Sequence, residues 1–396
     1  MFLTRLRVSN FRNLAPQEIT FDNRVTVITG KNGQGKTSLL ETVYLLSHNR
    51  SFRSGKTKDL LQWTAGPARE RVEGAVEATV SSSSGDRLIQ YFLRGNHREV
   101  FVNEKRVEKL SHFYGQLNSV IFTPEELQLV KGAPQQRRNF VDRSLAMVDP
   151  VFVEAAVQYQ RALKQRNALL GQLQQTKAPA SEAVSQLGFW DALLVKHGHI
   201  AAGRRRQFIA ALGEKVPNYY RALVSTTRLV RALERVSLRY TSDFLDESGE
   251  ILPTPKLEEL FAAEHLRDLR RGVTSVGFHR DDVEIFLETD FGAKPAKIAA
   301  SQGQARSVSL ALSLSAVDYL NERTGEPPVM LLDDVESELD QYRRAALFEL
   351  LSTFQAQVLL TTTEPTSAVK SFGSTTGFLA IEGGQVSADR DPKFPQ

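Results

Sequence analysis

The sequence predicts an α/β fold in which a mostly helical lobe is inserted into a sheet-containing domain. Near the N-terminus, the apolar run Val25–Thr29 leads through a glycine-rich loop into a helical pattern at Ser38–Ser47, which is how an α/β unit begins. The apolar spacing then becomes helical through the middle of the chain, and the α/β pattern returns toward the C-terminus. We therefore predict one split domain, residues 1–123 and 273–396, with residues 124–272 as the inserted lobe.

Composition is that of an ordinary globular protein and excludes several classes. The 396 residues are 41% hydrophobic and 24% charged, and no stretch approaches the roughly 20 apolar residues of a membrane helix. Arginines interrupt the first residues before a secretory signal can form. The absence of cysteine excludes disulfides, zinc fingers and thiol catalysis, and it fits a reducing compartment. We expect a cytoplasmic protein with no membrane contact.

Short apolar runs separated by turns predict the strands of the split domain. Leu3–Val8 and Ile19–Phe21 precede the glycine-rich loop. Residues 72–102 alternate with period two and are broken by the turn sequences SSSSGD and RGNH, which predicts an antiparallel sheet beside the parallel or mixed one. A long helix at Arg306–Arg323 and an apolar strand at Val329–Leu332 complete the second half of the domain.

The inserted lobe has the apolar spacing of a helical hairpin. Two runs of apolar residues near a 3.5-residue spacing flank the polar stretch TKAPASEA, and they contain Phe152, Ala156, Tyr159, Leu163, Leu170 and Leu173, then Leu187, Trp190, Leu194, Ala201 and Phe208. Such runs predict a short antiparallel hairpin. Because each arm holds about three heptads, we expect a compact lobe rather than a long coiled-coil arm.

Positive charge is concentrated in this lobe. Residues 151–242 hold 14 Lys and Arg against 5 Asp and Glu, a net charge of +9, which leaves −5 for the rest of a chain whose total is +4. A basic segment on a nearly neutral body is typical of proteins that bind a nucleic-acid backbone, although solvated helix faces are also rich in arginine. The candidate DNA contacts are Arg137, Arg138, Lys164, Arg166, Arg204, Arg205 and Arg206, and for each the alternative is a solvated helix charge.

The segment Gly30–Thr37, the phosphate loop, matches the pattern G-x-x-x-x-G-K-[ST] between a predicted strand and a predicted helix. Its glycines allow backbone N–H groups to surround phosphates, and the helix N-terminus adds partial positive charge. Lys36 is predicted to bind the β- and γ-phosphates, and Thr37 to bind Mg²⁺. The residues predicted to line an ATP site here are Gly30, Lys31, Asn32, Gly33, Gln34, Gly35, Lys36 and Thr37.

Asp333 and Asp334, the acidic pair, directly follow the apolar strand at Val329–Leu332. Parallel sheets place chemistry at the carboxyl ends of such strands. Asp333 is predicted as the Mg²⁺-side ligand, and Asp334 as the group that positions or deprotonates the attacking water. The alternative is a helix N-cap after a core strand. ABC-type ATPases usually carry glutamate at the second position, so the shorter aspartate predicts slow hydrolysis.

The segment Ser301–Gln304, the signature segment, resembles the L-S-x-G-Q signature of ABC ATPases, with Ala300 in place of the leucine. A serine hydroxyl and glycine N–H groups at a helix N-terminus can bind an anion. In ABC ATPases this segment faces the γ-phosphate held by the other subunit, so Ser301, Gly303 and Gln304 imply a homodimer with composite sites. The alternative is an ordinary serine N-cap. Asp340 lies in a sequence similar to the ABC loop that crosses the dimer interface.

Four further stretches narrow the resemblance to the bacterial RecF family of ABC-type, SMC-like ATPases, and together they cover most of the chain. They are LRVSNFRN at Leu6–Asn13, FTPEELQLVKG at Phe122–Gly132 with RRNFVD at Arg137–Asp142, QYQRALKQRN at Gln158–Asn167, and VGFHRDD at Val276–Asp282.

The resemblance implies an ATP- and Mg²⁺-dependent, weak DNA-dependent ATPase that dimerises on duplex DNA near single-strand gaps. It also implies partnership with RecR and RecO in loading RecA, and a role in DNA repair, replication and SOS induction. Arg12 is implied as a nucleotide contact, its alternative being a surface arginine. Two departures stand out: Phe278 replaces a usual proline, and Thr361–Thr363 stand where many ABC proteins have a switch histidine. His279 is expected to be structural rather than catalytic.

Three classes of function therefore compete. The first is an ATPase whose nucleotide cycle closes and opens a DNA-bound dimer. The second is a DNA-junction scaffold with ATP as a structural ligand. The third is the motor subunit of a membrane transporter, which shares the head motifs but has no need of a basic helical insertion.

Overall fold

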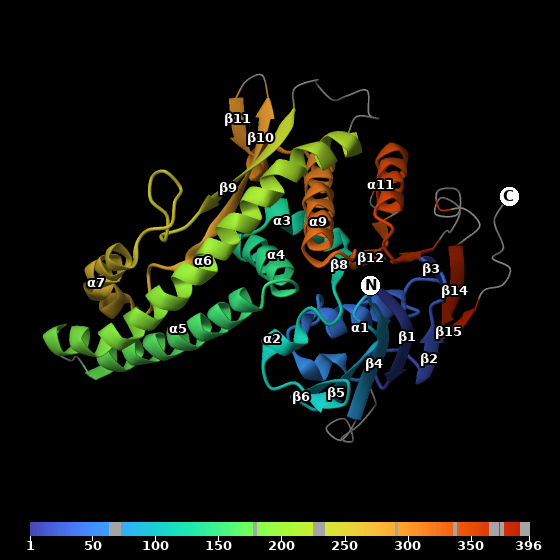
Figure 1. Cartoon of the computed structure of the whole chain (residues 1–396), viewed down its shortest axis with the longest axis horizontal. Helices are drawn as coiled ribbons and strands as arrows, with labels where there is room; N and C mark the ends of the chain where they lie inside the picture. Colours follow the sequence, from blue (N-terminus) through green and yellow to red (C-terminus); the bar gives the residue numbers. More distant parts are fainter. Residues whose placement is uncertain are drawn as a thin grey trace.

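The computed structural model of the chain describes residues 1–62, 73–176, 180–224, 234–289, 292–335, 339–363, 372 and 376–388. In Figure 1 the two six-stranded sheets lie on the right of the molecule, and the long helices α5 and α6 extend to the left. The predicted fold class, an ABC-type α/β head with an antiparallel subsheet and a helical insertion, is confirmed.

Six of the described strands form a mixed sheet, the central sheet, that positions the candidate site. Its order is β15 (Gln385–Ala388), β14 (Thr376–Glu382), β3 (Val25–Thr29), β13 (Val358–Thr362), β12 (Val329–Asp333) and β8 (Ser119–Phe122). All neighbours are parallel except β15, which pairs antiparallel with β14. Strands β12 and β13 are buried at every position because helices and a second sheet cover both faces.

A second, antiparallel sheet confirms the alternation at residues 72–102. Among the described strands its order is β2 (Gln17–Thr20), β1 (Phe2–Ser9), β4 (Glu73–Ser81), β5 (Arg87–Arg94), β6 (His97–Val102) and β7 (Lys105–Arg106). Helix α1 (Lys36–His48) packs between this sheet and the central sheet, and Leu39, Leu40 and Val43 are completely buried in the core that joins them. Burial on nearly all sides fixes the helix that follows the phosphate loop.

The predicted hairpin consists of α5 (Pro150–Thr176) and α6 (Ala180–Val224), which pack together along the lobe (Figure 1). Helix α6 is 45 residues long, so the expectation of about three heptads is wrong for this arm. Beyond the hairpin its apolar face continues through Leu212, Val216 and Tyr220 and packs on α9 (Gln302–Thr324) and β9 (Arg235–Thr241). The added burial carries the helix through Pro217.

The lobe and the split domain share one hydrophobic core. Phe152 and Tyr220 of the lobe belong to the same buried cluster as Val25 and Val27 of the central sheet. In the part of the chain that is described, a three-stranded sheet has β10 (Asp282–Thr289) between β9 and β11 (Gly292–Pro295). The pairing of β9 with β10 crosses the predicted boundary at residue 272. The other α-helices formed by described residues are α2 (Leu110–Phe113), α3 (Leu127–Lys131), α4 (Pro134–Ala146), α7 (Thr254–Arg271), α8 (Ala296–Ala299) and α11 (Gln341–Thr353).

Phe278 anchors the turn that precedes β10. Its ring is buried and packs edge-on against Phe152 and Tyr159, and the Arg205 guanidinium lies 3.5 Å from its centroid. An aromatic ring therefore fills this core position in front of β10. The preceding Gly277 has a φ of 122°, and a Cβ there would lie 2.4 Å from the Tyr159 hydroxyl, so glycine is required.

His279 has a structural role. Its Nδ1 lies 2.9 Å from the Tyr159 hydroxyl and its Nε2 lies 3.3 Å from the Thr274 carbonyl oxygen. Burial lowers the pKa of His279 to about 4, so the ring is neutral near pH 7. A neutral ring with both nitrogens engaged fits the expectation of a hydrogen-bonded core histidine.

Candidate nucleotide-binding site

The phosphate loop connects the end of β3 to the N-terminus of α1. Gly30, Gly33 and Gly35 have positive φ angles of 153°, 80° and 119°, which L side chains rarely adopt. A Cβ on Gly30 would lie 2.5 Å from the carbonyl oxygen of Ile381 in β14. The loop therefore needs glycine both for its backbone conformation and for its approach to the neighbouring strand.

Lys36 lies inside the loop and is 8% exposed. Its Nζ donates to the carbonyl oxygens of Gly30, at 2.5 Å, and Lys31, at 3.1 Å. Burial lowers the pKa of Lys36, and the negative charges of Asp334 and Asp333 oppose that shift. A partly desolvated ammonium at a helix N-terminus is suited to binding an anion such as a phosphate.

Thr37 and Asp333 come together as predicted for an Mg²⁺ site. The Thr37 hydroxyl donates to Asp333 Oδ1 at 2.9 Å although the two residues are 296 positions apart. Burial raises the pKa of Asp333, and the charges of Glu125 and Asp334 add to this rise. A hard cation would relieve that charge, and it would take its other ligands from phosphate oxygens and water. Among the described residues, no group of three or more His, Cys, Asp or Glu side chains could form a self-sufficient metal site.

Thr361, the first of the three threonines at the place expected for a switch histidine, connects the two acids. Its hydroxyl donates to Asp333 Oδ1 at 2.8 Å and accepts from the Asp334 N–H at 3.0 Å. Asp334 has a φ of 49°, so its backbone turns sharply as it leaves β12. The sequence marked Thr361 only as a departure, and its contact with the acidic pair depends on the pairing of β12 with β13.

A cavity of about 390 Å³ contains these groups. It is lined by Arg12, Asn13, Asn32, Gly33, Gly35, Lys36, Thr37, Ser38, Arg53, Asp333 and Asp334. The sequence did not predict Asn13, Ser38 or Arg53, although Asn13 and Ser38 directly follow predicted residues. Asn13 connects the opening of the chain to the phosphate loop, since its Nδ2 donates to the Gly33 carbonyl and its Oδ1 accepts from Ser38.

Arg12 forms one wall of this cavity but is held by protein groups. Its guanidinium makes a two-point ion pair with the completely buried Glu41, at 2.9 and 2.7 Å, and donates to the Asp59 carbonyl oxygen. Of the other predicted contacts, Lys31 is exposed. Gln34 braces the loop against the β14–β15 turn, because its Oε1 accepts from the Gly383 N–H.

The signature segment lies outside the cavity that contains the phosphate loop and the acidic pair. Ser301 is exposed and caps α9 in a capping box, accepting from the Gln304 N–H at 3.2 Å while Gln304 Oε1 accepts from the Ser301 N–H at 2.8 Å. Gly303 lies against the guanidinium of Arg343, which forms an ion pair with Asp340, the N-cap of α11. None of Ser301–Gln304 is among the described residues that line the 390 Å³ cavity.

Comparison with known proteins identifies the family of this chain. The model of the RecF/RecN/SMC N-terminal domain family matches residues 2–381. A curated protein of Geobacter metallireducens, named DNA replication and repair protein RecF, is 37% identical over 364 residues, which are 92% of this chain and 93% of the relative. This chain belongs to the RecF family.

Solved structures extend the likeness to the whole RecF fold. A structure of RecF with ATP, described as the recombination mediator protein in the RecFOR pathway, superposes with a TM-score of 0.84 at 28% identity, over 98% of this chain and 97% of that one. An Smc head bound to the C-terminal winged-helix domain of ScpA gives a TM-score of 0.54 at 12% identity and shows the fold alone. In the described part of this RecF family member, no helix has the length and apolar character needed to cross a bilayer.

Three of the arginines predicted to contact DNA have internal roles in this RecF fold. Arg166 is completely buried and pairs with Asp191 and Asp268, at 2.7 and 2.6 Å. Arg205, 3% exposed, pairs with Asp142 and Asp281, and Arg137, 8% exposed, pairs with Asp282. The expectation that these three side chains contact DNA is wrong for this structure, because all three are buried and each is paired with carboxylates of the protein itself.

The other four candidates lie at or near the surface. Arg138 donates to the Asp281 carbonyl oxygen and to Gln135, Arg204 pairs with Asp149, and Arg206 pairs with Glu250. Lys164 is exposed on α5. These four remain predictions for DNA contact.

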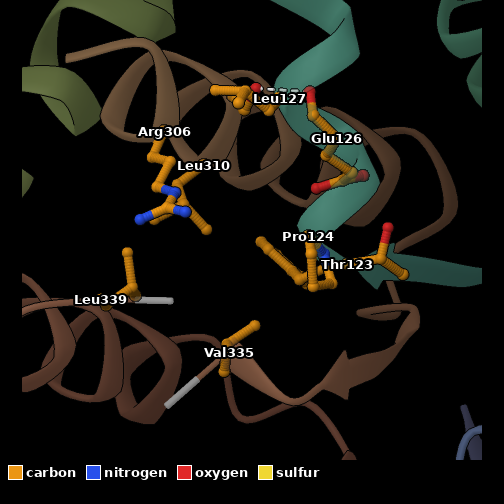
Figure 2. A pocket seen from close by; sticks show the side chains of 10 residues that line it. Thr123, Pro124, Glu126, Leu127, Arg306, Leu310, Val335 and Leu339 are labelled. Carbon is orange, nitrogen blue, oxygen red and sulfur yellow. Dashed lines mark hydrogen bonds between the residues drawn. The ribbon is translucent and has the colours of Figure 1, made fainter. Parts of the chain in front are cut away.

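A second cavity, of about 30 Å³, lies where the lobe begins and is large enough for a water molecule (Figure 2). Thr123, Pro124, Glu126 and Leu127 line it together with Arg306 and Leu310 of α9. Val335 and Leu339, from the segment that follows the acidic pair, line its other side. The hydroxyl of Ser309 donates to the Glu126 carbonyl oxygen at 2.6 Å, and the Ser313 hydroxyl lies 3.3 and 3.4 Å from the Glu126 carboxyl oxygens.

Glu126 should make this RecF family member less stable as the pH rises. Burial raises its pKa from 4.5 to about 8, so between these values the unfolded chain loses a proton that the folded chain keeps. The variant Glu126→Gln should therefore gain stability relative to wild type from pH 5 to pH 9, by about 2 kcal/mol or more at the upper end. Urea denaturation at pH 5, 7 and 9 measures this gain, and a difference that is the same at all three would contradict it.

Proposed function

We propose that this chain is an ATP-dependent DNA clamp of recombinational gap repair. Two copies would close head to tail around two ATP molecules, so that the signature segment of each contacts the γ-phosphate held by the other. The observation that carries the proposal is that the signature segment and the phosphate-loop cavity are separate within one chain. Ser301 is exposed at the start of α9, whereas other segments line the cavity that contains Lys36, Thr37 and the acidic pair. Each half-site is complete only with a second copy.

The residues of the cavity suit the hydrolysis of ATP. The phosphate loop and Lys36 would hold the phosphates, and Thr37 and Asp333 would hold Mg²⁺, which screens the phosphate charge. Asp334 would orient a water molecule and accept its proton while the water oxygen bonds to the γ-phosphorus and ADP leaves. Loss of the γ-phosphate removes the bridge between protomers, so the dimer opens and releases DNA. Aspartate in place of glutamate supports slow turnover.

The partners follow from the relatives and from the charge of the lobe. Solved RecF structures are described as parts of the RecFOR pathway, which supports RecR and RecO as partners and RecA loading as the outcome. Duplex DNA near a single-strand junction is the proposed substrate, with weak DNA-dependent ATPase activity, a contribution to SOS induction and a cytoplasmic location. The exposed or half-exposed side chains of Lys164, Arg138, Arg204 and Arg206 are the proposed phosphate contacts.

A second candidate function is a DNA-junction scaffold that uses ATP as a structural ligand. The short side chain of Asp334 and the tether of its N–H to Thr361 favour this candidate, because both limit how the carboxylate can reach a water molecule. ATP turnover measured with and without gapped DNA separates the two functions: a rate stimulated by DNA supports the clamp. The comparisons lend no support to the transporter hypothesis.

The variant Ser301→Arg tests the composite site. A bulky cation at the exposed cap should prevent ATP-dependent dimerisation on gapped duplex DNA and leave ATP binding by the monomer within about twofold of wild type. Sedimentation with and without ATP measures the mass in each case. Ser83→Arg, in the exposed turn between β4 and β5, is the matched control and should dimerise normally. A normal ATP-dependent dimer of Ser301→Arg would overturn the trans arrangement.

A further inference from the structure

Lys131, the last residue of α3, binds the end of α8. Its Nζ donates to the carbonyl oxygens of Ala296, at 3.4 Å, Lys297, at 3.1 Å, and Ala300. The Ala296 carbonyl oxygen also accepts from the Ala300 N–H at 3.0 Å. A lysine ammonium is a suitable donor to carbonyl groups at the C-terminal end of a helix. One side chain from the start of the lobe thus fixes the C-terminal end of a helix that lies 165 residues further along the chain.

The chain enters the signature segment directly from these carbonyls. Ala300 is 6% exposed and is followed by the exposed Ser301, whose hydroxyl caps α9. The direction in which Ala300 leaves α8 therefore sets where the Ser301 hydroxyl and the first N–H groups of α9 point. Lys131 is the side chain that holds this exit, through a charge-assisted hydrogen bond to Ala300 itself.

The other end of the same segment lies beside the acidic pair. Residues 123–131 follow β8, and Phe122 at the end of β8 pairs with Leu332 of β12, the residue before Asp333. Midway, the Glu126 carbonyl oxygen is held by Ser309 of α9, and the cavity of Figure 2 separates this stretch from Val335 and Leu339. Residues 123–131 therefore connect the strand pair next to Asp333 to the signature segment of the same protomer.

We propose that Lys131 is a positioning residue that orients the signature segment toward the nucleotide bound by the partner protomer. This inference rests on the proposed function, because it requires Ser301 to act in trans. Lys131 does not line the 390 Å³ cavity among the described residues, so its effect falls on closure of the dimer and not on capture of ATP by its own protomer.

The variant Lys131→Met keeps the length of the side chain and removes its charge. We expect the ATP affinity of the monomer to stay within about twofold of wild type. ATP-dependent dimerisation should become at least about tenfold weaker, because that factor corresponds to the loss of one charge-assisted hydrogen bond. Lys131→Arg should restore at least half of the lost dimer because a guanidinium can donate to the same carbonyls. Lys294→Met, an exposed lysine of β11, is the matched control and should dimerise like wild type.

Mixed dimers decide whether Lys131 acts on the partner or on its own protomer. Lys36→Ala cannot hold ATP but keeps an intact signature segment, whereas Lys131→Met keeps an intact phosphate loop. A mixture of the two has one composite site with both halves intact, so ATP-dependent heterodimers should form more readily than homodimers of either variant. Since the natural sequence has no cysteine, one introduced cysteine per protomer carries the fluorescent labels for this measurement.

Three results would overturn the inference: normal dimerisation of Lys131→Met, an equal loss of ATP affinity and dimerisation, or no heterodimer in the mixture. Ser301→Arg mixed with Lys36→Ala is the reference, and it should also give heterodimers. If that reference pair and the Ser301→Arg homodimer both behave against expectation, the composite site itself is wrong. If only the Lys131→Met measurements do, the proposed function stands and Lys131 is a structural residue.

Discussion

Replacing Lys36 with alanine is expected to weaken ATP binding at least about a hundredfold. The Lys36 ammonium is the one cation of the phosphate loop that is buried within it, and it already binds two loop carbonyls, so the loop is shaped to hold a charge at that point. Removing that charge leaves backbone N–H groups as the remaining phosphate donors of the loop. Isothermal titration or fluorescent-nucleotide binding by the monomer measures the loss.

Lys31→Ala is the matched control, since Lys31 belongs to the same loop but its side chain is exposed. ATP affinity of that variant should stay within about threefold of wild type, because an exposed charge interacts weakly with a phosphate through water. The melting temperature of Lys36→Ala without ATP should not fall, since burial lowers the pKa of Lys36 and its charge is held at a cost to the folded state. Unchanged ATP affinity in Lys36→Ala would show that the loop does not bind nucleotide.

The parts of the site that could be predicted from sequence are those fixed by short-range patterns. The glycines of the phosphate loop, the strand that ends in Asp333 and the helix that begins after Ser301 each carry their signal within about ten residues. The parts that could not be predicted depend on strand order. Thr361 contacts the acidic pair only because β13 lies beside β12, and the sequence alone does not state which strands are neighbours.

The buried arginines show why average charge was a poor guide to DNA contacts. Residues 151–242 carry a net charge of +9, but the carboxylates that neutralise Arg166 and Arg205 include Asp142, Asp268 and Asp281, all outside that range. Asp281 lies 76 positions from Arg205 and Asp268 lies 102 positions from Arg166. The net charge of a segment does not include carboxylates elsewhere in the chain that pair with its arginines. It therefore overestimates the positive surface available to a phosphate backbone.

The same long-range packing explains the wrong length of the second hairpin arm. Sequence periodicity identified the part of α6 that faces α5, where the spacing is regular. The rest of α6 is kept helical by α9 and by β9, which come from later parts of the chain. Tertiary burial of Val216 and Tyr220 outweighs the helix-breaking tendency of Pro217 between them.

Replacing Asp334 with asparagine is expected to reduce ATP hydrolysis at least about a hundredfold and to leave the dimer closed on DNA. Asparagine keeps the size of the side chain and its turn after β12, but it cannot accept a proton from water. Because ATP still binds through Lys36 and Thr37, the γ-phosphate bridge forms and is not removed. Sedimentation should show a DNA-bound dimer that persists for many times the lifetime of the wild-type complex.

Asp333→Asn gives the contrasting control. Loss of that charge removes the carboxylate that contacts Thr37, so Mg²⁺-dependent nucleotide binding should weaken and no trapped dimer should form. If Asp334→Asn hydrolyses ATP as fast as wild type, Asp334 is not the water-positioning group and turnover has no part in release. In that case ATP would act as a structural ligand, and the scaffold would be the better account of this chain. If Asp334→Asn gives a trapped dimer and Asp333→Asn does not, the clamp is required. A scaffold does not depend on ATP hydrolysis to release DNA, so blocking hydrolysis would not trap it.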